Sequence, residues 1–508
     1  MNPTVLNAQS IPPAADYVRI LPEIVLSIFG MLIMLLDPLV DEEKNQKTLG
    51  GIGLVGAAAA LVSTWFMAQT PGFAFWRMVR VDGFSVFFHV LVIATAIILI
   101  LTSYEYMAVQ KIRAGEYYGL ILLGVVGMCL MSSAVELVLI FIALEISSIS
   151  TYILAGFRRR SAISSESSLK YFLLGSFATA FFLYGVALMF GATGSTNIDD
   201  ISAALSSGEV PLLAYVAMAL MFVGLGFKVA AAPFHVWTPD VYEGAPAPVS
   251  GFMSTAPKAA AFAVLLRVVF EANAPGHFWP VWICAALSMS LGNIAALIQT
   301  NVKRLLAYSS IAHAGYMLIA FASAPDLGTS AVMFYSASYA AVNVGAFAVV
   351  SHLANAGERY VTVEDYAGLG RRSPILAGTL TIFLISLIGI PITGGFFAKF
   401  YVFSAALKSN LVGLTIIGVV NSAIAAYYYL KVIVVMYMRE PREEVPVLPI
   451  PLALGAALAI TLAATIYLGV LPGRVLEFTQ RSAEQLVQPR TSARTDRPAG
   501  VRASPQRR

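Results

Sequence analysis

Apolar runs of spanning length recur from one end of this chain to the other, separated by short polar connections. The core of a bilayer needs about 20 predominantly apolar residues per helix. The expected spans are residues 18–40, 48–70, 84–107, 116–134, 136–156, 168–192, 211–231, 248–271, 278–299, 303–323, 328–353, 374–406, 410–438 and 448–472. The pattern predicts an all-α polytopic membrane protein with about fourteen transmembrane helices.

Composition supports this class. Of the 508 residues, 58% are hydrophobic and only 12% are charged, whereas soluble domains are roughly 25% charged. The net charge of +4 gives no indication of nucleic-acid binding. Cys129 and Cys284 lie in apolar runs without the spacing of a metal site or a disulfide framework, so we interpret both as packing residues.

Basic residues gather in alternate connections, and this sets the expected orientation because translocation of Lys and Arg is disfavoured. The basic connections carry Lys44, Lys47, Lys111, Arg113, Arg158, Arg159, Arg160, Lys303, Arg304, Arg359, Arg371, Arg372, Arg439 and Arg442. The other connections carry almost no basic residues; the exceptions are Arg77, Arg80, Arg267 and Lys408. We therefore expect the basic connections to face the cytoplasm and both termini to lie on the opposite side.

The chain divides into three leading helices, two five-helix units, a last helix and a tail rich in Arg, Pro and Ser that we expect to be disordered. The divisions are 1–115, 116–272, 273–440, 441–475 and 476–508. Each five-helix unit has one helix interrupted by Pro and Gly, near 224–240 in the first and near 386–400 in the second. An odd number of helices per unit predicts an inverted repeat, an architecture of ion-coupled transporters.

Lys228 and Lys258 lie on either side of the first interruption, and Lys399 follows the second in a similar context of small residues and phenylalanine. A charge at membrane depth is costly and occurs mainly where polar groups line a water-filled cavity or an ion path. A buried lysine can also take up and release protons. These three lysines are therefore candidates for a proton path.

Glu145 lies nine residues after Glu136 in one apolar run, which places it about 13 Å deeper at 1.5 Å per residue. A carboxylate at that depth must be protonated or paired with a cation. We expect Lys228 to be its partner. The alternative is a charge pair that only locks two helices together.

Three further residues are secondary candidates for proton transfer. His235 follows the first interruption, His313 lies centrally in RLLAYSSIAHAGYMLI, and Lys431 lies in AAYYYLKVIVVMYM. The unperturbed pKa of histidine is near neutrality, although a lone histidine among apolar residues is more often a packed one. Lys431 could instead extend to the cytoplasmic edge.

Other polar positions give weaker indications. Asp240 and Glu243, in the connection WTPDVYEGAP, could cap the restarting helix or gate an opening, and we favour capping for Glu243. His89 and His352 lack supporting neighbours in the sequence. We find no GxGxxG after a strand, no Walker motif, no CxxC and no haem-spaced histidine pair. We expect no nucleotide, metal or redox centre on the chain.

Four runs carry a resemblance to a known family: SSLKYFLLGSFATAFFLYGVALMFGATGSTN, KVAAAPFHVWTPDVYEGAPAPVSGFMSTAPKAAAFA, NVKRLLAYSSIAHAGYMLIA and GIPITGGFFAKFYVF. Over roughly residues 15 to 475 the chain resembles subunit N of NADH-quinone oxidoreductase, an antiporter-like subunit of the membrane arm of respiratory complex I. Ser254 stands where the sister subunits usually have histidine, and Lys258 follows one turn later, as in subunit N. Lys399 also fits this subunit, whereas the Arg-rich tail departs from the family pattern.

The resemblance implies a proton-translocating subunit of the bacterial plasma membrane that works beside sister antiporter-like subunits. Glu145 and Lys228 would form a pair whose separation moves the proton equilibrium, with Lys258 as central relay and Lys399 as the terminal lysine. NADH, FMN, iron–sulfur clusters and quinone would be bound by other subunits. Two alternatives stay open: a stand-alone cation/proton antiporter subunit, and a purely structural membrane subunit.

Overall fold

The computed structural model describes residues 12–40, 42–112, 115–272, 275–441 and 449–487. Within these residues the regular structure is helical, apart from one hairpin of β1 (Gly72–Ala74) and β2 (Val79–Val81). The helices, in order, are α2 (Ala14–Arg19), α3 (Leu21–Leu36), η1 (Asp37–Leu39), α4 (Glu42–Ala68), α5 (Gly83–Gln110), α6 (Gly115–Ser133), α7 (Leu137–Ala155), α8 (Ala162–Thr193), α9 (Ile198–Ser206), α10 (Leu212–Val229), α11 (Thr238–Gly244), α12 (Ala247–Met253), α13 (Ala256–Leu266), η2 (Arg267–Glu271), α14 (Phe278–Leu297), α15 (Val302–Phe321), α16 (Pro325–Ala354), η3 (Ala356–Glu358), η4 (Val363–Tyr366), α17 (Leu369–Arg372), α18 (Pro374–Ile388), α19 (Gly394–Lys408), α20 (Val412–Met438), α21 (Leu452–Val470) and α22 (Gly473–Val487).

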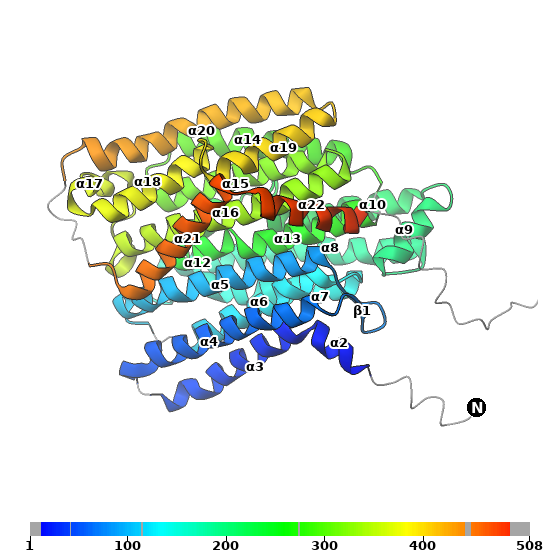
Figure 1. Ribbon diagram of the computed structural model, residues 1–508, viewed down its shortest axis with the longest axis horizontal. Coiled ribbons are helices and arrows are strands. Elements are labelled where there is room, and N and C mark those ends of the chain that lie inside the picture. The colour runs from blue at the N-terminus through cyan, green and yellow to red at the C-terminus, as the bar shows by residue number, and fades with distance from the viewer. Residues whose placement is uncertain (1–11, 41, 113–114, 273–274, 442–448, 488–508) are drawn as a thin grey trace, which may run out of the picture.

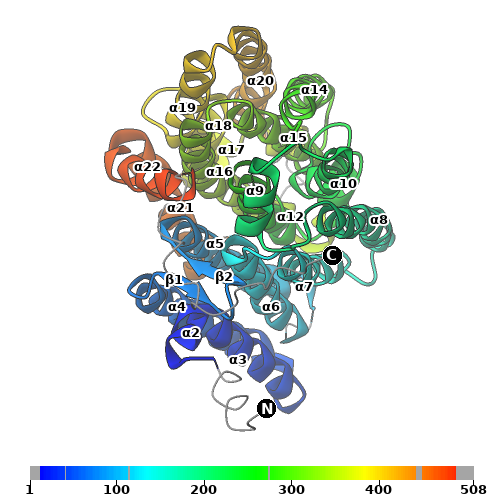
Figure 2. The same cartoon turned by 90° about the vertical axis from the view of Figure 1, so that its right-hand side faces the viewer.

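Long apolar helices lie side by side in one layer, roughly horizontal in Figure 1 and seen nearly end on in Figure 2. Twelve helical segments of the described chain are long and apolar enough to cross a membrane. The two other expected spans, 303–323 and 374–406, correspond to α15 and to the pair α18 and α19. The prediction of an all-α polytopic membrane protein is confirmed.

Both expected helix interruptions are present. The first separates α10 from α11, and the second separates α18 from α19. Each preceding helix ends on a left-handed residue, Ala230 (φ 59°) and Gly389 (φ 94°), whose N–H bonds back to carbonyls of the last turn. Such a terminus stops an α-helix while satisfying part of its free carbonyls. That the two five-helix units are related by inversion stays a prediction.

The end of the chain differs from the sequence interpretation. We predicted a disordered tail from residue 476, yet α22 extends to Val487 and packs against α16 and α5. Its Thr479 hydroxyl lies 3.1 Å from that of Ser330, and the Phe478 ring stacks on Phe87. The sequence GRVLEFTQRSAEQLV is amphipathic, and its many polar residues concealed one packed face. Residues 488–508 lie outside the described part of the chain.

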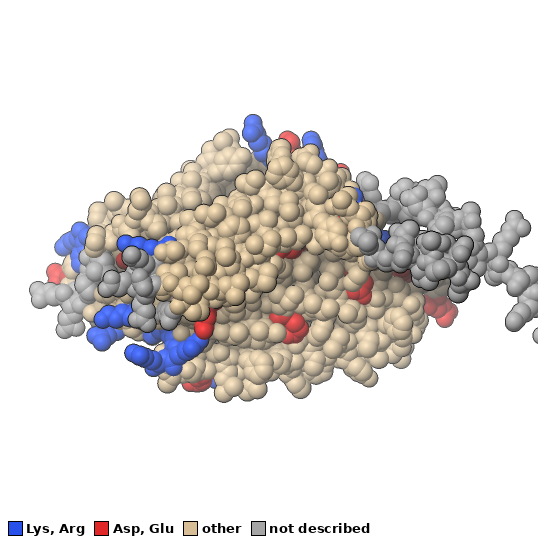
Figure 3. Space-filling view, turned by 90° about the horizontal axis from the view of Figure 1, so that it is seen from below, with Lys and Arg blue, Asp and Glu red and all other residues tan. Residues whose placement is uncertain are grey.

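Charge divides between the two ends of the layer. Lys and Arg gather at one end in Figure 3, the left end in Figure 1, where the connections with Arg159, Arg371 and Arg439 lie exposed. We call this the basic end. The opposite end holds the hairpin, α9 and the start of α5 (Figures 1 and 2).

Three of the four basic residues that departed from the charge pattern are paired with carboxylates at that opposite end. Arg80 and Arg267, 2% and 0% exposed, share Asp82 and Glu271 in a buried cluster of ion pairs. Burial alone would raise the pKa of Asp82, but the two guanidinium groups hold it well below its usual value. Arg77 pairs with Asp199 at 2.9 Å. Neighbouring carboxylates neutralise these three arginines. Their presence at this end is therefore compatible with the excess of positive charge at the basic end.

The cluster gives a stability prediction. Arg267→Met leaves Asp82 and Glu271 buried with a single cation, a change that costs about 3–5 kcal/mol when a buried pair is broken. The variant should unfold at clearly lower temperature in detergent than the parent chain. Arg77→Met, at an exposed pair worth about 1 kcal/mol or less, is the control. Equal melting temperatures for all three proteins would contradict the assignment.

Candidate functional site

Lys228 lies in the last turn of α10, next to the first interruption. Its Nζ donates hydrogen bonds to the hydroxyls of Ser148 at 2.6 Å and Tyr152 at 3.1 Å, both on α7. The ring centroids of Tyr152, Tyr171 and Phe227 lie 5.0, 5.8 and 5.8 Å from Nζ. Hydroxyls, aromatic faces and the negative end of a helix dipole thus hold the ammonium group without a carboxylate.

Glu145 does not form the predicted direct pair with Lys228. Among the described residues, Oε1 of Glu145 is buried and accepts no hydrogen bond, and no ion pair joins the two side chains. Glu145, Ser148 and Tyr152 lie at positions i, i+3 and i+7 of α7, so they share one face. Lys228 is bound one turn away from the carboxylate, with Ser148 between them.

Lys258 lies just after the interruption between α12 and α13 and is 2% exposed. Its Nζ donates to the backbone oxygen of Ser310 at 3.0 Å and to the hydroxyl of the same residue on α15. One turn earlier, the Ser254 hydroxyl accepts from the side-chain amide of Asn343 on α16, whose own buried Oδ1 has no hydrogen-bond partner among the described residues. A buried amine and an unsatisfied amide oxygen therefore lie beside one broken helix.

His313 is the centre of a group of tyrosines. Its Nδ1 lies 2.7 Å from the Tyr335 hydroxyl, and its Nε2 lies 3.4 Å from the Tyr429 hydroxyl. The ring of Tyr339 is 4.9 Å away, centroid to centroid, and its buried hydroxyl has no partner in the described chain. The histidine has hydroxyl contacts on two sides, as a proton relay requires.

Lys399 follows the second interruption and is 5% exposed. Its Nζ donates to the backbone oxygens of Leu387 at 3.1 Å and Ile388 at 2.8 Å, and to the Ser422 hydroxyl at 2.8 Å. Leu387 and Ile388 are the last two residues of α18. The lysine of the second half-helix thus satisfies the free carbonyls of the first, and the ring of Tyr316 lies 4.9 Å below the ammonium.

Helix α15 joins these groups. Ser310, His313 and Tyr316 follow one another at three-residue intervals, so each is about 60° around the helix from the previous one and the three form a row that winds along it. Ser310 contacts Lys258, Tyr316 contacts Lys399, and the His313 ring lies between them, 5.7 Å from that of Tyr316. We call this set the α15 ladder. It spans about 9 Å along the helix axis at 1.5 Å per residue.

The secondary candidates lie at the edges of this arrangement. His235 is half-buried in the interruption after α10, and its Nδ1 is buried without a hydrogen-bond partner among the described residues. Lys431 is half-buried on α20, two residues after Tyr429, which contacts His313. The geometry places both near the ladder's helices without joining either to it directly.

Asp240 and Glu243 do not cap α11, contrary to the interpretation that we favoured for Glu243. The N-cap residue is Trp237, and no side chain caps the helix. Arg304 pairs with both carboxylates at 2.8 Å, and Lys170 pairs with Asp240 at 2.7 Å. The pairs tie the restarting helix to α8 and α15 at the basic end.

Sequence reasoning missed the partners of two histidines. His89 Nε2 lies 2.9 Å from Glu23, and His352 Nδ1 lies 2.9 Å from Glu105. Both carboxylates lie on other helices, so no local pattern reveals the pairs. The hydroxyls of the α15 ladder could have been found, since Ser310, His313 and Tyr316 repeat every three residues in SSIAHAGY. No group of three or more metal-ligating residues occurs within the described chain.

Comparison with known sequences gives one family. Residues 134–425 match the family described as NADH:quinone oxidoreductase/Mrp antiporter, TM. NADH-quinone oxidoreductase subunit N 2 of Koribacter versatilis is 64% identical over 490 residues, which are 95% of this chain and 99% of that protein. NADH-quinone oxidoreductase subunit N of Trichlorobacter lovleyi is 45% identical over 472 residues, with 92% and 96% coverage.

Solved structures agree with the sequences. A chain of respiratory complex I from Thermus thermophilus matches with a TM-score of 0.78 at 39% identity, over 90% of this chain and 98% of that chain. A chain of the Mrp complex from Dietzia sp. matches with a TM-score of 0.79 at 20% identity, over 92% and 98%. The second likeness concerns the fold alone.

The surroundings of Lys258 predict that this lysine does not stabilise the fold. Its hydrogen-bond partner is neutral, so Lys258→Met removes a desolvated amine without leaving a buried countercharge. A methionine of similar length can fill the space. The variant should melt in detergent at the same temperature as the parent or higher. A fall in melting temperature as large as that expected for Arg267→Met would contradict this prediction.

Proposed function

The chain belongs to the family of NADH-quinone oxidoreductase subunit N, and we propose on that basis that Glu145, Lys228, Lys258 and Lys399 carry protons through it. The protein is a membrane subunit of NADH-quinone oxidoreductase, in the proton-translocating class of complex I, and its partners are the other membrane subunits of that complex. The proposal concerns which residues of this chain move the proton.

One observation carries the proposal: the α15 ladder contacts a buried lysine at each end. Neither lysine has a carboxylate within ion-pair distance in the described chain. A buried amine with only neutral acceptors exists readily in both protonation states. Hydroxyls and an imidazole between two such amines provide short steps for a proton.

In the first step, the charge distribution around Lys228 changes. A rotamer change of the lysine from Ser148 towards Glu145, one turn away on α7, would form the ion pair that is open in this structure. A charge change in a neighbouring subunit supplies the energy for this movement. The electrostatic potential at Lys258 changes when the Lys228 ammonium moves.

In the second step, the proton leaves the Lys258 ammonium, which becomes a neutral amine. It passes along the hydroxyl of Ser310, the imidazole of His313 and the neighbouring tyrosine hydroxyls, and arrives on the amine of Lys399. The carbonyls of Leu387 and Ile388 stabilise the new ammonium there. His235 and Lys431 are secondary positions on this route.

In this proposal, the basic end faces the cytoplasm of a bacterial cell and both termini lie on the other side of the plasma membrane. The gathering of Lys and Arg at one end supports this orientation (Figure 3). The redox chemistry of NADH, FMN, iron–sulfur clusters and quinone belongs to other subunits. This chain contributes the proton path and the contacts that transmit charge changes to it.

A stand-alone cation/proton antiporter subunit would use a similar fold, as the Mrp likeness indicates. A tagged form of this chain, purified in mild detergent, separates the two functions. We expect NADH-oxidising partner subunits to be recovered with it. A preparation that contains only antiporter-type partners would favour the alternative.

Lysine variants test the proton path directly. Lys228→Ala should assemble into the complex and lower NADH-driven proton uptake in vesicles severalfold, because the first step loses its movable charge. Lys47→Ala, at an exposed lysine of the basic end, is the control and should pump as the parent does. Unchanged uptake with normally assembled Lys228→Ala would disprove the role, and failed assembly without a specific pumping defect would favour the structural alternative.

A further inference from the structure

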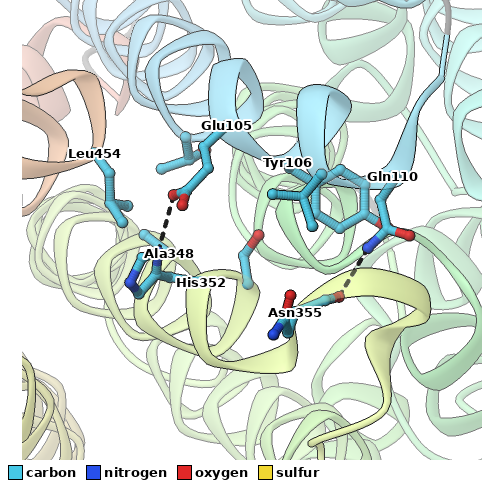
Figure 4. Close-up of a pocket in the computed structure, with 10 residues that line it drawn as sticks. Glu105, Tyr106, Gln110, Ala348, His352, Asn355 and Leu454 are labelled. Carbon is cyan, nitrogen blue, oxygen red and sulfur yellow. Dashed lines mark hydrogen bonds and ion pairs between the residues drawn. The ribbon is translucent and has the colours of Figure 1, made fainter. Parts of the chain in front are cut away.

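A small cavity opens at the basic end between α5, α16 and α21 (Figure 4). Its volume is about 10 Å³, the size of a single water site. Glu105 and Tyr106 of α5 and His352 of α16 project towards it, and Leu454 of α21 closes one side. None of these residues belongs to the proton path described above.

Glu105 and His352 form the polar wall of the cavity. Nδ1 of His352 lies 2.9 Å from Oε2 of Glu105, and the two side chains are 1% and 18% exposed. The pair therefore reaches water on the carboxylate side and is buried on the imidazole side. An imidazole has two ring nitrogens, so it can take a proton on one side and release a proton on the other.

The rim of the cavity is fixed in position. Gln110 donates to the backbone oxygen of Asn355 at 2.9 Å and accepts from the N–H of Gly357 at 3.0 Å. Asn355 and Glu358 both have left-handed backbone, with φ of 57° and 52°. Non-glycine residues are rarely held in this conformation unless the surroundings determine it, and such strain concentrates at functional sites.

The strained turn carries Glu358, which contacts Tyr106 of the cavity wall from behind. The Tyr106 hydroxyl donates to its Oε1 at 2.8 Å, and its Oε2 pairs with Lys303 at 2.7 Å and with Arg158 at 2.8 Å. Lys303 and Glu358 are 1% and 4% exposed. Tyr106, Glu358 and Lys303 thus form a continuous hydrogen-bonded series that leads inward from the cavity.

Lys303 begins the helix that carries the α15 ladder. Seven residues further along, Ser310 contacts Lys258. Near Lys258 lie buried polar atoms with no partner in the described chain: Oδ1 of Asn343, whose amide donates to Ser254, and the hydroxyl of Tyr339, whose ring contacts His313. Buried atoms of this kind are places for ordered water, which conducts protons between fixed groups.

Among the lining residues, the groups that can carry charge are Glu105, His352 and Tyr106. Behind Tyr106 lie Glu358, Lys303 and Arg158, which Tyr106 reaches through its hydrogen bond to Glu358. Helix α21 carries no Asp, Glu, Lys, Arg or His.

We propose that this cavity is the proton entrance of the chain, with Glu105 and His352 as the collecting pair and Tyr106, Glu358 and Lys303 as the relay towards Lys258. The inference rests on the proposed function. The Lys303 ammonium gives its proton to water on the Lys258 side and becomes an amine. Glu358 takes the Tyr106 proton and passes it to that amine, and Tyr106 regains a proton from the cavity water. The hydroxide left in the cavity takes a proton from the His352 and Glu105 pair, and that pair takes one from the water outside. Every group returns to its initial state after one proton has entered.

Two small changes test the entrance in the assembled complex. Tyr106→Phe removes one hydroxyl and keeps the ring, and Glu105→Gln removes the carboxylate. Both variants should assemble as the parent does. Both should slow NADH-driven proton uptake at alkaline pH, where few protons are available to enter. The alkaline limb of the pH profile should therefore move about one pH unit lower, the size of a typical pKa shift in a protein. Glu105→Asp should restore the parent profile, because it retains the carboxylate. Glu116→Gln, at an exposed pair with Arg159 of the same end, is the matched control.

Lys258→Ala, measured beside these variants, separates this inference from the proposed function. A pH-independent loss in Lys258→Ala with parent-like profiles in Tyr106→Phe and Glu105→Gln would overturn the entrance and leave the proton path standing. Parent-like pumping in Lys258→Ala would overturn the path and the entrance together. A uniform loss in Glu105→Gln that Glu105→Asp does not restore would show a structural role and also overturn the entrance.

Discussion

A helix that breaks inside a bilayer leaves carbonyl groups that water cannot reach, and the rest of this structure depends on how those groups are satisfied. At the second break, the donor is the Lys399 ammonium on the carbonyls of Leu387 and Ile388. At the first, Lys228 lies in the last turn of α10, and the Trp237 indole donates to the carbonyl of Phe227. At the second break, the broken backbone and the buried cation therefore stabilise each other directly, whereas at the first the indole satisfies the carbonyl and the hydroxyls of α7 hold the lysine.

The same reasoning explains how the two ends of the molecule differ. Charges outside the membrane core face water, and their sign matters for insertion rather than for packing. At the end opposite the basic one, Arg80 and Arg267 are buried against Asp82 and Glu271. At the basic end, exposed arginines surround a smaller buried set that includes Glu358 and Lys303. Buried ion pairs therefore occur near both ends of the molecule, and the lysines without a carboxylate partner among the described residues, Lys228, Lys258 and Lys399, lie between those ends.

Much of the fold could be predicted from sequence because its causes are local. Spanning length follows from apolar runs, and the breaks follow from Pro and Gly. The lysines beside the breaks stood out because charge is rare in such runs. Helix α22 was missed because its single packed face is hidden among polar residues.

Contacts between distant segments could not be predicted in the same way. Ser148 and Tyr152 compete with Glu145 for Lys228, and only the packing of α7 on the end of α10 decides which group wins. Glu23 and His89 are 66 residues apart, and Glu105 and His352 are 247 apart. A single sequence contains no periodicity that relates such positions. The histidines that lacked neighbours in the sequence have them in space.

The α15 ladder has one more consequence. Its three contact residues lie on a single helix, so the helix itself sets the spacing between the group that contacts Lys258 and the group that contacts Lys399. Insertion of one residue between Ser310 and Tyr316 would turn the second contact about 100° around the helix axis, because an α-helix has 3.6 residues per turn. Helix α15 therefore holds its contact residues at a fixed spacing, and we expect side-chain rotation and water to open and close the path along it.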